Sequence, residues 1–262
     1  MAATAFAHVS DLHIETSPAA DRAAGRLCDA LLMQPGPVLL TGDVTHRGRR
    51  DELTMFRELF APLLRTGRLL AVPGNHDRLG DDLRQDLMPG PRVQAVASGG
   101  LWIVRLDSTG PHNRRWLDGH GEVSARDIDE VEAALRCAPP GLMSILMLHH
   151  HPVPLAHDHP MEQLVSLLGW PNARELRSGP ALLSRVRGLC DAVLHGHRHV
   201  PAELNPWPAD ARPLRIFSGG SSTLQRQFRS FRSPRAAACW IPLEPPEALL
   251  ARPMGWPSLG GP

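Results

Sequence analysis

Five short motifs hold the side chains of this chain that could do chemistry, and each follows an apolar run. In chain order they are Asp11-Leu12-His13, Gly42-Asp43, Gly74-Asn75-His76-Asp77, His149-His150-His151-Pro152 and Gly196-His197-Arg198-His199. Carboxylate and amide oxygens suit hard divalent cations, and imidazole nitrogens suit transition metals. Ligand sites form where the carboxyl ends of parallel strands meet, so these distant residues can converge. The motifs therefore predict a centre for two divalent ions in a hydrolase.

The first two motifs supply carboxylates and one imidazole. On an extended chain Asp11 and His13 point the same way, so one ion could bind both. Gly42 allows a sharp turn that exposes Asp43, whose two carboxylate oxygens could bridge two ions. Taken alone, either motif is explained equally well by a surface turn. Because three further motifs of the same kind follow in the chain, a metal site is the favoured interpretation of both.

The third motif combines a predicted ligand with an acid–base candidate. Asn75 offers a neutral carbonyl oxygen to an ion. Its neighbour His76 is expected to lie near the ion without binding it, where it could bind a phosphoryl oxygen or protonate a leaving group. Asp77 could orient His76. We predict that His76 and Asp77 are catalytic; the alternative is that Asn75 is an ordinary helix N-cap.

The two histidine motifs complete the predicted ligand set. His197 and His199 are two residues apart after a strand, so alternation again allows both to reach the site. In the run of three histidines, His150 is the predicted ligand because it lies two residues before a proline. His149 is the second choice, and His151 is expected to face substrate or solvent. Outside the five motifs, two segments carry further candidates for substrate contact. His112, Asn113 and Arg114 lie in the loop after the strand at 101–107, and His46 and Arg47 follow the Asp43 loop.

Seven apolar runs are expected to form the strands that position these motifs: residues 5–10, 38–41, 69–73, 101–107, 143–148, 192–195 and 214–218. Helical spacing of apolar residues predicts helices at 19–33, 51–64, 124–137 and 181–188. This alternation indicates a layered α/β fold. We predict one domain over residues 1–233, with a cap-like insertion at 151–180. A further strand and a proline-rich tail are expected over 234–262.

Composition excludes several classes of function. The net charge is +1, so no basic excess indicates a nucleic-acid partner. The arginines at 226, 229, 232 and 235 are interpreted as a solvated face, because no aromatic ladder accompanies them. The chain contains no lysine, which excludes a Schiff-base or Walker A mechanism. It has neither a signal-peptide pattern nor a long apolar segment, and its four cysteines form no CxxC pair, so we expect a cytoplasmic protein without a membrane partner.

The ordered motifs D-x-H, G-D, G-N-H-D, H-x-P and G-H-x-H resemble the calcineurin-like metallophosphoesterase superfamily. The resemblance implies an α/β four-layer fold, with two packed mixed β-sheets flanked by helices. It also implies two divalent ions per chain, such as Mn, Fe or Zn, and a bridging hydroxide that attacks phosphorus in line. His76 matches the catalytic histidine of the superfamily. The implied ligands are Asp11, His13, Asp43 and His199 for one ion, and Asp43, Asn75, His150 and His197 for the other.

Within the superfamily, the segments around Asp43, Asn75, Asp107 and the histidine run look like the class III cyclic-nucleotide phosphodiesterase branch. This similarity predicts hydrolysis of a cyclic nucleotide or a similar small phosphodiester. The alternative is a broad-substrate phosphomonoesterase with the same metal site. The intact His76 argues against a regulatory module that has lost catalysis. The near-neutral net charge argues against a nuclease. The oligomeric state is left open, with a homodimer as one option.

Overall fold

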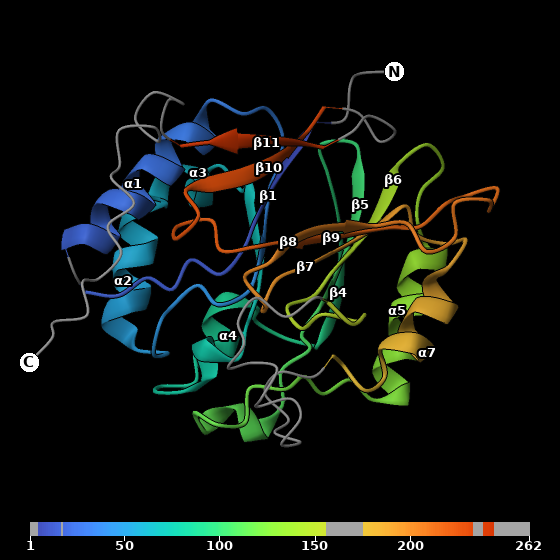
Figure 1. Cartoon of the computed structure of the whole chain (residues 1–262), viewed down its shortest axis with the longest axis horizontal. Helices are drawn as coiled ribbons and strands as arrows, with labels where there is room; N and C mark the ends of the chain where they lie inside the picture. Colours follow the sequence, from blue (N-terminus) through green and yellow to red (C-terminus); the bar gives the residue numbers. More distant parts are fainter. Residues whose placement is uncertain (1–4, 17, 156–174, 233–237, 244–262) are drawn as a thin grey trace, which may run out of the picture.

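Two β-sheets packed face to face form the centre of the molecule (Figure 1). The computed structural model describes residues 5–16, 18–155, 175–232 and 238–243. β1, β2 and β3 of the first sheet are parallel, whereas β10 runs antiparallel to β1. The carboxyl ends of three consecutive strands therefore lie at one edge. The strand order in this sheet is β11 (Cys239–Pro242), β10 (Gln227–Phe231), β1 (Phe6–Val9), β2 (Val38–Thr41) and β3 (Leu69–Val72).

The second sheet has a parallel centre with an antiparallel strand at each edge. β5, β6, β7 and β9 pair in parallel, so two of the predicted motifs, which follow β6 and β7, lie at the same edge of this sheet. The strand order is β4 (Val93–Ser98), β5 (Leu101–Leu106), β6 (Met143–Met147), β7 (Ala192–His195), β9 (Arg215–Gly219) and β8 (Pro201–Leu204).

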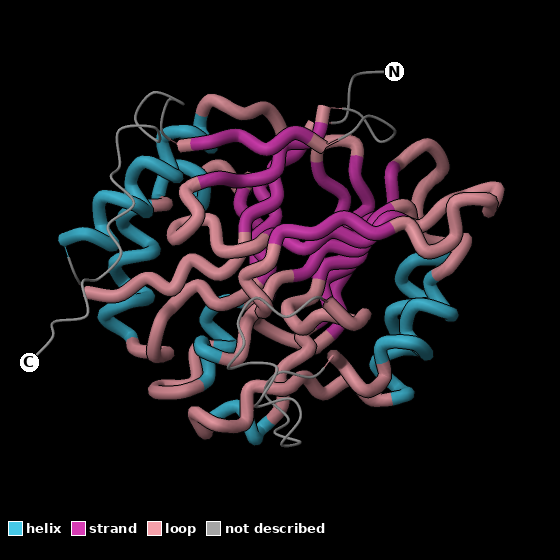
Figure 2. The backbone as a smooth tube through the Cα atoms, in the orientation of Figure 1, coloured by secondary structure: helices cyan, strands magenta, loops and turns pink. Residues whose placement is uncertain are grey.

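Helices cover the outer faces of both sheets, as Figure 2 shows. The first sheet is covered by α1 (Pro18–Leu32), α2 (Arg50–Leu59) and α3 (Ala61–Arg65). The second is covered by α5 (Ala125–Arg136) and α7 (Gly179–Val186). Three short elements lie in the connections: η1 (His76–Arg78), α4 (Arg84–Leu87) and η2 (Pro111–Arg114). The predicted four-layer arrangement is confirmed.

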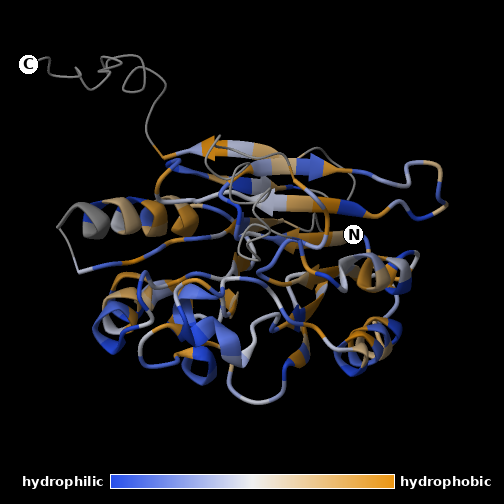
Figure 3. Ribbon diagram, turned by 60° about the horizontal axis from the view of Figure 1, so that its bottom comes forward, coloured by the Kyte–Doolittle hydropathy of each residue, from blue (hydrophilic) through white to orange (hydrophobic). Residues whose placement is uncertain are grey.

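Alternation along the central strands explains the layers. In β2, Leu39 packs between the two sheets, whereas Val38 and Leu40 pack against the helices of the first sheet. In β6, Ile145 packs between the sheets and Leu146 packs against the helices of the second. Strands that are buried on both faces read as continuous apolar runs, which is why they are predictable from the sequence. Figure 3 shows the complementary pattern on the helices, which carry apolar and polar residues on different sides.

All seven predicted strands are present, as β1, β2, β3, β5, β6, β7 and β9. The sequence did not reveal β4, β8 or β10. β4 and β8 are edge strands with half-exposed, partly polar residues, so they lack a continuous apolar run. The helix predicted at 51–64 is divided at Phe60, because Pro62 lies in the first turn of a new helix, α3. Ser124 caps α5 as expected, and its hydroxyl accepts a hydrogen bond from the Asp127 amide at 3.1 Å.

The interpretation of the arginine cluster as a solvated face is wrong for Arg229. This side chain lies in β10 and is 3% exposed. Its guanidinium lies 4.9 Å from the ring centre of Phe217 and 4.4 Å from that of Trp240, and it forms an ion pair with Glu203 at 3.3 Å. A guanidinium can be buried when aromatic faces and a carboxylate replace its hydration.

Much of the predicted insertion, residues 156–174, lies outside the described residues, as does the tail at 244–262. The strand expected after residue 233 corresponds to β11, which pairs with β10 and so extends the first sheet. Within the described ranges, none of the helices is long and apolar enough to cross a membrane.

Candidate metal centre

Each of the five motifs begins within three residues of the end of a parallel strand. Asp11 follows β1, Asp43 follows β2 and Asn75 follows β3, while the two histidine motifs follow β6 and β7. The sheets are packed so that these ends meet. The amide of His197, for example, donates to both carboxylate oxygens of Asp11 at 3.1 Å. The predicted convergence is therefore present in the structure.

The candidate ligands lie on left-handed backbone, not on extended strands. Seven non-glycine residues of the described chain have a positive φ, and five of them are Asp11 (52°), His13 (44°), Asp43 (48°), His197 (75°) and His199 (54°). The expectation that alternation on an extended chain aligns these side chains is wrong. Such backbone costs about 1–3 kcal/mol per residue and persists where the surroundings impose it, which is typical of functional sites.

Two motif glycines allow the loops to approach each other closely. A Cβ atom at Gly74 would collide with the backbone amide and carboxylate of Asp43, and one at Gly196 would collide with the side chains of Ser10 and Asp11. A larger residue would push these loops apart. The glycines therefore belong to the motifs because the candidate ligands need this space.

One group of candidate ligands consists of Asp11, His13 and His199, and we call it the outer cluster. Its donor atoms lie within 4.8 Å of one another. The Nε2 atoms of His13 and His199 are 2.9 Å apart, and His199 Nε2 lies 3.4 Å from an oxygen of Asp11. Burial is the main cause that lowers the pKa of His13 to about 4. A neutral imidazole keeps the lone pair that an ion needs.

A second group consists of Asn75, His149 and His197, and we call it the inner cluster. The amide oxygen of Asn75 lies 3.0 Å from His149 Nε2 and 3.0 Å from His197 Nδ1. His149 is fully buried, and its Nδ1–H donates to the Thr41 carbonyl at 2.8 Å. That bond turns Nε2 toward the site.

Asp43 lies between the two clusters. Its Oδ2 atom is 3.4 Å from His149 Nε2 in the inner cluster and 3.8 Å from His13 Nε2 in the outer one. Burial disfavours its charge, yet the facing histidines, His149 first, hold the pKa of Asp43 well below its usual range. Burial alone would lower the pKa of His149, but the charge of Asp43 raises it to about 9. The local field therefore favours cations, so the residues present fit divalent ions.

His150 has a different environment from its neighbour. One of its ring nitrogens lies within 4.8 Å of those of His149 and His197. However, Ser108 Oγ donates to His150 Nδ1 at 2.9 Å, and His150 Nε2–H donates to the Gly119 carbonyl at 3.0 Å. Both ring nitrogens of His150 thus form hydrogen bonds within the protein.

The expectation that His151 faces substrate or solvent is wrong. This residue is 2% exposed and stacks on His197, with the two ring centres 5.5 Å apart.

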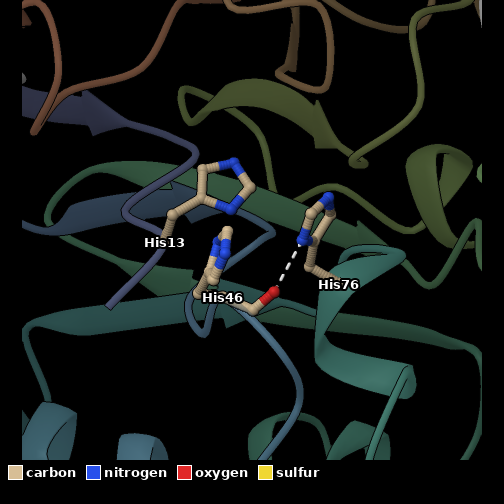
Figure 4. A group of neighbouring side chains, drawn as sticks. All are labelled: His13, His46 and His76. Atoms are coloured by element: carbon tan, nitrogen blue, oxygen red, sulfur yellow. Dashed lines mark hydrogen bonds between the residues drawn. The ribbon is translucent and has the colours of Figure 1, made fainter. Parts of the chain in front are cut away.

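His76 lies beside His13 of the outer cluster and close to His46, as Figure 4 shows. Its ring centre is 4.6 Å from that of His13, and its Nδ1–H donates to the His46 carbonyl at 2.7 Å. Asp77 does not make this orienting bond. It is fully buried and accepts hydrogen bonds from the amides of Gly74 and Thr45 at 2.8 Å each. Burial, and then the charge of Asp43, raise the pKa of Asp77 to about 6. Asp77 thus joins the second and third motif loops.

Two further residues near the site were not identified from the sequence as site residues. Ser108 follows β5 and contacts the histidine run through its hydroxyl, including the amides of His149 and His150 at 3.3 and 3.2 Å. Trp116 is 58% exposed and lies 5.3 Å from the His76 ring. Ser108 belongs to a segment, Leu106-Asp107-Ser108, that carries part of the family resemblance, so a signal existed. No spacing connects Trp116 with the motifs.

The fold, the motifs and their convergence define a metal-dependent phosphoester hydrolase. The model of the calcineurin-like phosphoesterase family matches residues 4–201, and the chain belongs to that family. All five motifs lie inside the matched region.

Curated relatives carry names that agree with the family. The chain is 25% identical over 233 residues to a probable cyclic nucleotide phosphodiesterase from Pseudoalteromonas sp. (strain SM9913), covering 84% of this chain and 78% of that protein. It is 30% identical to a probable cyclic nucleotide phosphodiesterase from Rhodococcus erythropolis, covering 73% of this chain and 64% of the relative. It is 28% identical to the 3',5'-cyclic adenosine monophosphate phosphodiesterase CpdA of Pseudomonas aeruginosa, covering 72% and 61%. The chain thus spans less than two thirds of the last two relatives.

Solved structures support the fold. A dimetal phosphatase from Danio rerio superposes with a TM-score of 0.60 at 12% identity, covering 93% of this chain and all of that one. The 5'-nucleotidase from Candida albicans gives a TM-score of 0.51 at 12% identity, covering 93% of this chain and 53% of that one. At this identity the likeness establishes the four-layer fold alone.

Proposed function

We propose that the protein hydrolyses a cyclic nucleotide or a similar small phosphodiester, and that it uses two divalent ions for this reaction. The observation that carries the proposal is the position of Asp43 between two clusters of metal-binding side chains, with His76 beside one of them. The names of the three curated relatives support the choice of a diester.

The proposed ligands follow the two clusters. Asp11, His13 and His199 would hold one ion together with Asp43. Asn75, His149 and His197 would hold the other, again with Asp43. Here His149 replaces His150, which is the ligand expected from the sequence. The reason is that His149 Nε2 faces Asn75 and Asp43, whereas both ring nitrogens of His150 bond to Ser108 and Gly119.

Bound ions would lower the pKa of a water molecule and neutralise the charge that develops on phosphorus. The chain's own residues would do the remaining work. Because His76 Nδ1–H is held by the His46 carbonyl, Nε2 is the ring atom available to the substrate. A protonated Nε2 can donate to the oxygen that leaves phosphorus. A diester with a poor leaving group needs such a proton donor, which typically contributes about 10²–10⁴-fold.

The decisive experiment measures metal content and turnover together. Purified protein would be stripped with a chelator, checked by elemental analysis and reloaded with Mn, Fe or Zn. Each form would be assayed on cyclic AMP, bis-p-nitrophenyl phosphate and p-nitrophenyl phosphate. We expect no turnover after stripping, recovery on reloading, and a higher kcat/KM for the two diesters than for the monoester. Turnover of the stripped protein would overturn the metal mechanism, and a preference for the monoester would establish the alternative, a phosphomonoesterase.

A further inference from the structure

A pocket with an unusual charge lies next to His76. Its lining includes Arg47, Arg49, Arg114 and Trp116, together with Leu79 and Gly80. Trp116 connects this pocket to the catalytic region, because its ring lies 5.3 Å from that of His76 and 6.2 Å from that of His46. A continuous path of side chains thus runs from the outer cluster, through His76 and Trp116, to the three arginines.

Among the described residues, none of the three arginines forms an ion pair with a carboxylate within 4.0 Å, and Arg114 has only a longer-range attraction to Asp82. The acidic groups nearby are engaged elsewhere. Glu52 is 3% exposed, and its carboxylate accepts hydrogen bonds from the backbone amides of Arg47 and Arg49 at 2.9 and 3.1 Å. Asp82 forms an ion pair with Arg78 at 2.9 Å. Burial disfavours the charge of Asp82, but Arg78, and after it Arg114, lower the pKa of this carboxyl. The guanidinium groups of the pocket are therefore available to an external anion.

The backbone under this pocket is firmly held. The Gly48 carbonyl accepts a hydrogen bond from the Asp81 amide at 2.7 Å. A Cβ at Gly80 would lie 2.8 Å from the Arg47 carbonyl oxygen, so the two loops pack backbone to backbone. Arg47 and Arg49 therefore project from a backbone that is held on both sides of Gly48, which reduces the entropy lost when they bind a ligand.

We propose that this pocket binds a second phosphate group, so that the preferred substrate is a nucleotide phosphodiester that carries a phosphate in addition to the scissile one. This inference rests on the proposed diesterase function and deepens it. A simple cyclic nucleotide has one phosphate, which the metal centre would use. Three guanidiniums beyond His76, none of them in a close ion pair, match a further anion, and the exposed Trp116 is suited to stacking on a base between the two phosphates.

The test uses two substrates that differ by one phosphate. Adenylyl-(3'→5')-adenosine, ApA, has one phosphodiester, and pApA has the same diester with a terminal 5'-phosphate. We expect the metal-loaded enzyme to show a KM for pApA about tenfold lower than that for ApA, with the difference shrinking as salt is raised. Equal KM values for the two substrates at low salt would overturn the proposal.

Substitutions separate the contribution of the arginine charges from that of base stacking on Trp116. Arg47→Gln and Arg114→Gln should each raise the KM for pApA about three- to tenfold and leave the KM for ApA unchanged. Trp116→Ala should raise the KM for both substrates at least about fivefold. Arg136→Gln is the matched control, because this exposed arginine lies on α5, where it pairs with Glu132. An equal effect of the arginine variants on ApA and pApA would contradict the second-phosphate site.

A separate binding experiment distinguishes failure of this inference from failure of the proposed function. Calorimetry with metal-loaded His76→Asn protein measures the affinities for ApA and pApA without dependence on turnover. If the wild-type enzyme hydrolysed no diester, the proposed function would fall, and tighter binding of pApA would still support the anion pocket. If diesters were hydrolysed but pApA bound no more tightly than ApA, the inference would fall alone.

Discussion

The outer and inner clusters differ in how much the protein encloses them. In the outer cluster, the His199 side chain is 38% exposed and that of His13 is 11% exposed. In the inner cluster, His149 is fully buried and Asn75 is 8% exposed. Buried donors that are held by hydrogen bonds lose little freedom when they bind an ion. If the centre binds two ions as proposed, we expect the inner ion to be tightly held and the outer ion, beside His76, to be more exchangeable.

The largest effect is expected where the two clusters meet. Asp43→Ala removes the carboxylate that faces both, and we expect a loss of activity of about 10³-fold or more, with the loss of both ions. Elemental analysis of the purified variant would measure the ions, and circular dichroism would confirm that it is folded. Two tightly bound metals per chain in a folded Asp43→Ala variant would break the idea of a shared carboxylate.

The next effect concerns His76, the proposed proton donor beside the outer cluster. His76→Ala should keep its metal content and lose about 10²–10⁴-fold in kcat for a diester with an alkoxide leaving group, because that group needs a proton. The loss should be smaller for a nitrophenyl ester, whose leaving group departs without one. Equal losses on both substrates would instead indicate that His76 binds the phosphate.

A third test compares adjacent histidines in the inner cluster. His149→Ala should weaken binding of the inner ion about 100-fold or more, whereas His150→Ala should weaken it about tenfold, because His150 bonds to Ser108 and Gly119. Metal titration followed by calorimetry would measure both affinities. The reverse order would restore His150 as the ligand.

The smallest effect is expected at the exposed edge of the outer cluster. His199→Ala should lower the affinity of the outer ion about tenfold and leave the inner ion in place, because water can replace an exposed imidazole. Dialysis against chelator, with metal content followed over time, should release one ion before the other in the wild-type protein. Simultaneous release of both ions would remove the distinction between the clusters.

The chemistry and the central strands could be predicted from the sequence for one reason. Each central strand is buried on both faces, so it is a continuous apolar run, and each motif follows such a run by a few residues. The edge strands β4 and β8 lack that signal, because all of their residues are exposed or only partly buried. Arg229 was misinterpreted because its burial depends on Trp240 and Phe217, which approach it from other strands.

The sequence by itself determined the family, the residue types of the centre and the edge of the sheets at which they gather, since these follow from local patterns. Only the tertiary structure decided which side chains face one another. The contrast between His149 and His150 depends on Thr41 at the end of β2 and on Ser108 and Gly119 in distant loops. The left-handed backbone at Asp11 and Asp43 also depends on packing: Asp tolerates this conformation better than most residues, but the surrounding loops hold it there. Trp116 and its arginines meet only because separate loops fold onto the same side of His76.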